Sequence, residues 1–302
     1  MKESFLRDIR QQFRDALKDR YPPGEISSIF HLLTSHYFGF PRTQLAMEPQ
    51  TTLSPEKTGL LLGALEKLLA NIPVQYITGN TLFMDMELQV SRSVLVPRPE
   101  TEELVRWIIA SHKDAGSRRI LDIGTGSGCI ALGLKKNWGE ATLLGMDVSS
   151  GALEIARNNA QALQLEVRFR QGNIREPGMD WPAFDLLVSN PPYVPARDRA
   201  YMQPHVAESE PPLALFVPDE DPLCFYRDIL RFGKRHLKPG GWLYLEIYEA
   251  FGKRVCKLLR ESGFTDIEIK KDIFGKARFV RGQRPGTPFA EESAIANKKY
   301  SK

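Results

Sequence analysis

Four consecutive residues, Asn190-Pro191-Pro192-Tyr193, have the types and order needed to hold a planar amino group. They follow the apolar run 184–189, which is typical of a buried parallel strand. Proline has no backbone N–H, so the segment presents mainly acceptors, namely the Asn190 side-chain oxygen and the prolyl carbonyls. These could take both hydrogens of an –NH2 group and aim the nitrogen electrons at an electrophile, while Tyr193 packs against the flat group. An ordinary turn is the alternative, because Asn and Pro are common turn residues.

A glycine-rich stretch upstream, Asp122-Ile123-Gly124-Thr125-Gly126-Ser127-Gly128, is a candidate cofactor loop. Glycines let the backbone approach a ligand closely at a helix N-terminus, and Asp147 ends the next expected strand, where a carboxylate could accept ribose hydroxyls. The dinucleotide pattern needs a third glycine where Cys129 stands, and no Gly-Lys-Ser/Thr phosphate loop is present. Because an acid before the first glycine repels pyrophosphate but suits an ammonium group, we expect S-adenosylmethionine rather than a nicotinamide cofactor. The residues expected to hold it are Asp122, Gly124, Thr125, Gly126, Ser127, Gly128, Asp147 and Asn190.

Two further pairs of residues are candidates for the same site. Asn173 follows the third expected strand and could bond an adenine amino group or cap a turn, and Ile174 would then lie against the ring. Arg98 stands between two prolines and Glu100 follows the second of them, and these two residues could line the catalytic mouth or pair with each other. No cysteine-histidine spacing indicates a metal site, so we expect none.

The elements that must position these residues alternate between short apolar strands and helices from residue 119 onward. Strands are expected at 120–123, 141–147, 167–170, 184–189, 242–247, 267–269 and 277–280, with helices at 150–163, near 222–236 and at 250–262. This alternation predicts a doubly wound, largely parallel α/β sheet. Thr101 is expected to cap the start of a helix that follows it, in which Leu104, Val105 and Ile108 continue an apolar stripe.

The chain is expected to divide into four segments. Residues 1–71 carry apolar positions at helical spacing and form a helical bundle for recognition or support, and 72–93 form a linker with a β-hairpin that turns at Gly79-Asn80. The catalytic domain is expected at 94–282, followed by a loose tail at 283–302.

The 302-residue composition is that of a globular protein, with 42% hydrophobic and 26% charged residues. Three cysteines argue for a reducing compartment, and neither a secretory signal nor a membrane-spanning run is expected, so the cytoplasm is the default. The net charge of +4 is scattered along the chain, which is typical of a solvated surface rather than of stable nucleic-acid binding.

Together these motifs resemble the protein-(glutamine-N5) methyltransferases, specifically the peptide chain release factor glutamine methyltransferase (PrmC/HemK) family. The matching segments are 73–79, 94–105, 122–128, 188–193, 210–215 and 275–279. The family's third-strand acid is replaced by Asn173, so the contact there must be neutral. The resemblance implies a class I methyltransferase fold with a seven-stranded sheet. A monomer would suffice for the chemistry of such an enzyme. It also implies methyl transfer from S-adenosylmethionine to the glutamine side-chain nitrogen in the Gly-Gly-Gln loop of class 1 release factors, with S-adenosylhomocysteine as by-product.

We hypothesise that Asn190 and the Pro191 carbonyl accept the two amide hydrogens and orient the nitrogen, so that positioning rather than proton abstraction drives the reaction. An alternative is an N6-adenine or N2-guanine nucleic-acid methyltransferase, because a base amine needs the same acceptors. The first seventy residues contain no strongly basic run, which argues against it. A non-catalytic binding module is a third possibility, which the intact Asn-Pro-Pro-Tyr disfavours.

Overall fold

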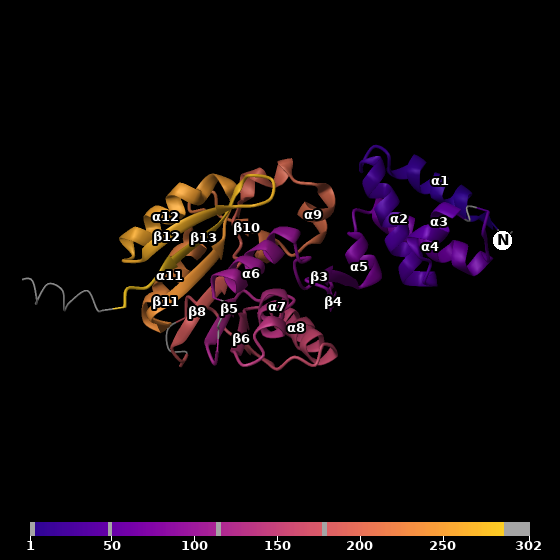
Figure 1. The fold of residues 1–302 in the computed structure, drawn as a ribbon. Coiled ribbons are helices and arrows are strands. Elements are labelled where there is room, and N and C mark those ends of the chain that lie inside the picture. The colour runs from indigo at the N-terminus through magenta and orange to yellow at the C-terminus, as the bar shows by residue number, and fades with distance from the viewer. Residues whose placement is uncertain (1–3, 48–49, 113–115, 177–179, 287–302) are drawn as a thin grey trace, which may run out of the picture. The chain divides into compact units, whose positions relative to one another are not determined.

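The computed structural model describes residues 4–47, 50–112, 116–176 and 180–286 (Figure 1). The chain divides into two compact units, of which the first comprises residues 1–80 and 202–209 and the second comprises 81–201 and 210–302. The expected tail at 283–302 lies outside the described residues from 287 onward, and its first residue, Gln283, still belongs to the last strand.

The first unit is helical. Its helices are α1 (Leu6–Leu17), α2 (Pro23–Phe38), α3 (Arg42–Met47), α4 (Pro55–Leu69) and α5 (Val74–Thr78), and β1 (Ser4–Phe5) pairs with β2 (Thr52–Leu53). Helix α4 begins after Ser54, whose hydroxyl accepts a hydrogen bond from the Lys57 N–H and so satisfies one free donor of the first turn. Phe13 and Phe30 meet edge to face in the core, with ring centroids 5.1 Å apart.

A short segment from much later in the chain completes this unit. Helix α9 (Pro204–Ser209) is joined to Asn71, two residues after the end of α4, because the Asn71 amide donates to Glu208 at 2.8 Å and the Ser209 hydroxyl donates to the Asn71 carbonyl at 2.7 Å. The rings of Tyr21 and His205 lie 5.5 Å apart. No local periodicity in the sequence indicates this excursion.

The predicted hairpin is present, but the predicted turn at Gly79-Asn80 is wrong. Residues 74–78 form helix α5, and Gly79, in the left-handed conformation with φ 77°, ends it. The hairpin pairs β3 (Asn80–Phe83) with β4 (Met86–Gln89) and turns at Met84 and Asp85, whose φ values are 47° and 57°. Two consecutive positive φ values are those of the tight turn that suits twisted strands, and the Met84 N–H is held by Glu102 at 2.8 Å.

The second unit is built on a seven-stranded sheet in the order β12-β13-β11-β8-β5-β6-β7, most of which can be followed in Figure 1. Its strands are β5 (Arg119–Ile123), β6 (Thr142–Asp147), β7 (Val167–Gln171), β8 (Phe184–Ser189), β11 (Leu237–Glu246), β12 (Thr265–Lys271) and β13 (Ala277–Gln283). All neighbours pair in parallel except β13, which is antiparallel to both β11 and β12. The predicted largely parallel α/β sheet is confirmed.

Helices cover both faces of this sheet, and alternate strand residues pack against each set. On one face Ile120 and Leu186 belong to a core with α6 (Pro99–Ser111), α7 (Cys129–Asn137) and α8 (Ser150–Ala162). On the other, Leu121 and Leu187 pack with α11 (Cys224–His236) and α12 (Gly252–Glu261). From β5 the chain adds strands β6 and β7 toward one edge of the sheet, and from β8 it adds β11 and the later strands toward the other edge. The switch point of the sheet therefore lies between β5 and β8.

The connection from β8 to α11 contains several short elements, namely β9 (Val194–Pro195), the 3-10 helix η1 (Ala196–Tyr201), α9, α10 (Pro212–Leu215) and β10 (Phe216–Val217). β9 and β10 pair in parallel. A second 3-10 helix, η2 (Glu249–Phe251), precedes α12. Among the described residues, none of the helices combines the length and the hydropathy needed to cross a membrane.

Candidate active site

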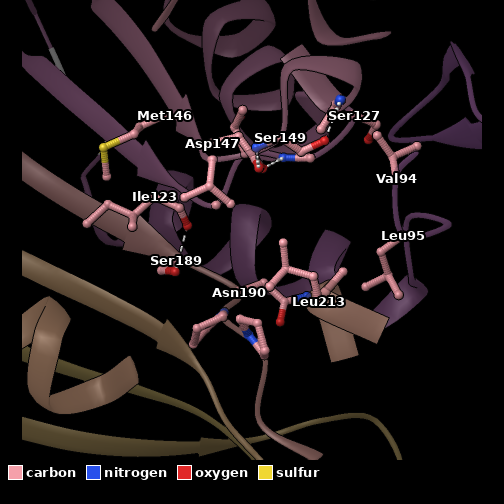
Figure 2. A pocket seen from close by; sticks show the side chains of 18 of the residues that line it. Val94, Leu95, Ile123, Ser127, Met146, Asp147, Ser149, Ser189, Asn190 and Leu213 are labelled. Atoms are coloured by element: carbon pink, nitrogen blue, oxygen red, sulfur yellow. Dashed lines mark hydrogen bonds between the residues drawn. The ribbon is translucent and has the colours of Figure 1, made fainter. Parts of the chain in front are cut away.

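A cavity opens beyond the carboxyl ends of β5, β6 and β8, which is where doubly wound sheets bind ligands. Asp147 and Ser149 lie across it from Asn190 and Leu213 (Figure 2). The Ser189 hydroxyl donates to the Ile123 carbonyl at 2.7 Å, so it ties the end of β8 to the end of β5 at the cavity floor. Predicted site residues that line the cavity are Gly124, Thr125, Gly126, Ser127, Asp147, Asn173, Ile174, Asn190, Pro191 and Pro192.

The glycine loop has the backbone conformation that its composition predicts. Gly124, Gly126 and Gly128 have φ values of 73°, 55° and 83°, which side chains rarely allow. The Gly126 N–H donates to Asp147 at 2.9 Å, and the other oxygen of that carboxylate accepts the Ser149 N–H at 2.9 Å. Gly128 precedes α7 rather than lining the cavity, and a Cβ there would lie 3.3 Å from Phe169. Asp147 therefore braces the loop and presents a carboxylate at the cavity edge.

Asp122 is placed behind this loop rather than in the cavity. Its side chain is fully buried, and Oδ2 accepts hydrogen bonds from the Thr125 hydroxyl at 2.6 Å and the Ala131 N–H at 3.3 Å. Oδ1 is buried and has no recorded hydrogen-bond partner, and burial raises the pKa of the carboxyl to about 7. Direct contact between Asp122 and a ligand stays a prediction.

Asn173 and Ile174 follow β7 and line the cavity wall. The Asn173 side-chain oxygen accepts the Arg175 N–H at 3.0 Å, which is the turn-capping role that the sequence left open. The oxygen keeps a second lone pair, so the adenine contact stays a prediction.

Asn190 is half-buried at the end of β8, and its side-chain NH2 donates to the Thr101 hydroxyl at 3.1 Å. That hydroxyl donates to Glu246 at 2.8 Å, and the Tyr193 hydroxyl donates to the other oxygen of Glu246 at 3.0 Å. Tyr193 is not among the cavity-lining residues, and its ring lies beside Tyr248 with centroids 6.2 Å apart. The structure thus links two of the predicted residues through a carboxylate that sequence reasoning did not select.

Glu246 ends β11 and is 1% exposed. Burial raises the pKa of its carboxyl to about 7, although the hydrogen bonds from Thr101 and Tyr193 and the nearby Arg278 lower it. The signal that could have found Glu246 is an acid at the end of a strand that is otherwise apolar. The prediction that Thr101 caps its helix is wrong, because α6 already begins at Pro99, a residue favoured in the first turn.

Arg98 lines the cavity, but it pairs with Glu210 rather than with Glu100. One terminal nitrogen of Arg98 donates to both oxygens of Glu210, at 2.8 and 2.7 Å. Glu210 is 2% exposed, and burial raises its pKa against the effect of the Arg98 guanidinium. This pair anchors the start of the segment 210–215, from which Pro211, Leu213 and Ala214 line the cavity. Within the described residues, no cluster of three or more His, Cys, Asp or Glu side chains could hold a metal.

Comparison with known proteins gives two kinds of match. Residues 8–79 match the model of the PrmC N-terminal domain, and residues 104–209 match that of the methyltransferase small domain. The fold is similar to a solved methyltransferase from Pyrococcus furiosus, with a TM-score of 0.51, 20% identity, and coverage of 74% of this chain and 98% of that one. The hMettl16 catalytic domain is similar with a TM-score of 0.55, 14% identity, and coverage of 90% and 95%.

Three curated relatives match along almost their whole length, and each is named release factor glutamine methyltransferase. The protein from Bacteroides thetaiotaomicron is 41% identical and that from Flavobacterium psychrophilum 38%, each over 91% of this chain and over 99% and 98% of their own. The Deinococcus radiodurans protein is 35% identical over 93% of this chain and 99% of its own.

The sheet order, the cavity at its switch point and the matched domain define a methyltransferase of the class I fold. Among such enzymes, the chain belongs to the release factor glutamine methyltransferase family. The predicted fold class and family are thereby confirmed.

Proposed function

We propose that this chain transfers a methyl group from S-adenosylmethionine to the side-chain amide nitrogen of the glutamine in the Gly-Gly-Gln motif of a class 1 peptide chain release factor. The observation that carries the proposal is Asn190-Pro191-Pro192 lining one cavity with the glycine loop and Asp147, in a chain whose relatives are named for this reaction. Because the substrate belongs to translation, we place the reaction in the cytoplasm, and one copy of the chain suffices for it.

The residues of the cavity fit S-adenosylmethionine on grounds of charge and shape. Asp147 at the edge has the carboxylate that a ribose diol needs. The Asp122 carboxyl behind the loop is charged above its pKa of about 7, and in that form it favours a cation over a phosphate. The Ser127 hydroxyl lies on the cavity wall beside the Cys129 thiol, and a hydroxyl can both donate to and accept from a ligand. When bound, S-adenosylmethionine would supply an electrophilic methyl group on a sulfonium.

Asn190 and Pro191 would act on the substrate amide. Because the Asn190 NH2 is engaged by Thr101, its side-chain oxygen is the atom left to accept one amide hydrogen, and the Pro191 carbonyl would accept the other. Holding both hydrogens orients the nitrogen for in-line attack on the methyl group. This positioning raises the rate of methyl transfer. The amide proton can leave after methylation, so no general base is required of this chain.

The test is one incubation of the purified protein with labelled S-adenosylmethionine, a purified class 1 release factor and total RNA. The expected result is label in the release factor only, at the glutamine of its Gly-Gly-Gln motif after peptide mapping. The matched control is the same release factor with that glutamine changed to asparagine, which should take up no label. Label in RNA and not in protein would instead favour a nucleic-acid methyltransferase.

A further inference from the structure

We propose that Glu246 is a positioning residue that fixes the hydrogen-bond polarity of the site, so that Asn190 turns its side-chain oxygen and not its NH2 toward the substrate. The inference deepens the proposed function and rests on it in one respect, namely that this oxygen accepts a hydrogen from the substrate amide. Glu246 does not line the cavity and acts only through Thr101 and Tyr193.

The direction of each hydrogen bond follows from what each group can donate. An ionised carboxylate only accepts, so the single hydroxyl hydrogen of Thr101 must point to Glu246, at 2.8 Å. The Thr101 oxygen can then only accept from Asn190, which requires the nitrogen side of the Asn190 amide at 3.1 Å. An amide can rotate to exchange its oxygen and nitrogen, and the two atoms have opposite hydrogen-bonding roles. The carboxylate therefore selects one of two amide orientations two hydrogen bonds away.

We call the two hydrogen bonds that connect Glu246, Thr101 and Asn190 the relay. The hydrogen bond between Tyr193 and Glu246 determines which oxygen of Glu246 would carry a proton. If Glu246 held a proton toward Tyr193, the phenol hydrogen would lose the acceptor it has at 3.0 Å, and no other is recorded for it among the described residues. If the proton instead pointed to Thr101, that hydroxyl could donate to Asn190 after a rotation of the amide, so every donor would keep an acceptor. Protonation of Glu246 thus favours the orientation in which Asn190 presents NH2 to the substrate, where it repels the amide hydrogens.

Glu246 gains or loses its charge near neutral pH, where the enzyme would work, because burial raises its pKa to about 7. The titratable and charged groups that act on it come from several elements around β11. They are Glu100 from α6, Cys129 from α7, Tyr193 from the segment after β8, Tyr226 from α11 and Arg278 from β13. Turnover should accordingly rise with pH through about 7, as the carboxylate forms and sets the relay.

The relay can be tested without any catalysis by nuclear magnetic resonance of the Asn190 side-chain NH2 in nitrogen-15-labelled protein. Its resonance is assigned by its loss in Asn190→Asp. In the wild type it should titrate together with the Glu246 carboxyl near pH 7. In Thr101→Val, which keeps the shape of the side chain but not its hydroxyl, and in Glu246→Gln, the Asn190 resonance should no longer titrate. A wild-type resonance that stays constant from pH 5 to pH 9 would overturn the proposal, whatever the activity.

Kinetic measurements on variants of Thr101 and Glu246 then show whether these residues position Asn190 or only stabilise the fold. Thr101→Val should lower kcat about tenfold or more with S-adenosylmethionine affinity unchanged, and Thr101→Ser, which restores the hydroxyl, should recover most of the rate. Glu246→Gln should lower kcat and remove the acidic limb of the pH profile. Equal kcat in Thr101→Val and Thr101→Ser would refute the relay. A titrating Asn190 resonance in a wild type that methylates no glutamine would refute the proposed function and leave the relay standing.

Discussion

At the scale of single residues, the site combines groups of two kinds. Asn190, Pro191 and Asp147 line the cavity and can touch a ligand. Thr101 also lines the cavity, and together with the buried Glu246 it decides which way the Asn190 amide faces. Residue types could suggest the first kind, although the segment Asn190-Pro191-Pro192 could also be an ordinary turn until the glycine loop and Asp147 are considered with it. The second kind depends on which strand ends meet, and that is a property of the sheet order.

Asn190→Ala should lower turnover by about two powers of ten or more, by analogy with the loss of one oriented polar group. S-adenosylmethionine affinity should fall no more than about threefold, because Asp147 and the glycine loop are untouched by the change. Turnover is measured with release factor as substrate, and affinity by calorimetry. Asn173→Ala is the matched control on the cofactor side, where affinity should fall more than kcat. Full turnover in Asn190→Ala would contradict the role assigned to Asn190.

The buried Asp122 makes stability depend on pH. Its pKa is about 7 in the folded chain and 3.8 for the ordinary group, so between these values the folded state holds a proton that the unfolded state releases. The free energy of unfolding should therefore fall as pH rises through this window, by up to about 1.4 kcal/mol per pH unit for this group. Asp122→Asn removes the titration while its amide oxygen can still accept from Thr125.

Urea unfolding of both proteins at pH 5 and pH 8 measures this dependence. Relative to the wild type, Asp122→Asn should be more stable at pH 8 than at pH 5. Burial raises the pKa of Asp185, but the Arg119 N–H and Lys238 outweigh burial and bring this pKa below its ordinary 3.8, so the stability that Asp185 contributes is complete at pH 5 and is lost only as pH falls below 3.8. The stability difference between Asp185→Asn and the wild type should therefore be the same at pH 5 and pH 8, which makes this variant the control. The same stability difference between wild type and Asp122→Asn at both pH values would show that Asp122 is ionised throughout.

At the scale of elements, the parts that followed from sequence are those with a strong local pattern. β5, β8 and β11 are apolar runs that must be buried on both faces, so a parallel sheet could be predicted from them. The turn of the β3–β4 hairpin could not, because Met84 and Asp85 hold positive φ through contacts such as the one to Glu102 rather than through glycine. Helix α9 escaped prediction for a related reason, since its partner Asn71 lies far away in the sequence.

The contact between β6 and the glycine loop makes Gly145 a sensitive position for cofactor binding. A Cβ at Gly145 would lie 2.6 Å from a carbon of Phe169 and 2.8 Å from the Thr125 hydroxyl, so both must shift. Gly145→Ala should cost about 1–3 kcal/mol of stability and, because Thr125 belongs to the loop, weaken S-adenosylmethionine binding about tenfold. Thermal unfolding and calorimetry measure the two effects.

Gly282→Ala is the matched control for that substitution. Its Cβ would lie 2.6 Å from Leu259 on α12, so it should also destabilise the fold by overpacking. None of the cavity-lining residues comes from β13 or α12, and its S-adenosylmethionine affinity should stay within about twofold of the wild type. If both variants lost affinity equally, the loss would reflect general destabilisation rather than the loop.

At the scale of the whole molecule, the chain separates chemistry from the unit that we expect to recognise the substrate. Among the residues that the structure describes, those that line the cavity all belong to the second unit. A chain without residues 1–80 should therefore bind S-adenosylmethionine within about threefold of the intact protein. Its residues 202–209 lose the partners Tyr21 and Asn71, so thermal unfolding must first show that the rest stays folded.

The truncated chain separates recognition from catalysis when it is given two substrates. On an intact release factor its kcat/KM should fall about tenfold or more, because contacts made by the helical unit would be lost while the acceptors at Asn190 remain. On a short peptide that contains Gly-Gly-Gln, the truncated and intact proteins should have similar kcat/KM, since such a peptide reaches only the cavity. Unchanged kcat/KM on the intact release factor would exclude recognition by residues 1–80, and an equal loss on both substrates would mean that the helical unit supports the catalytic cavity instead.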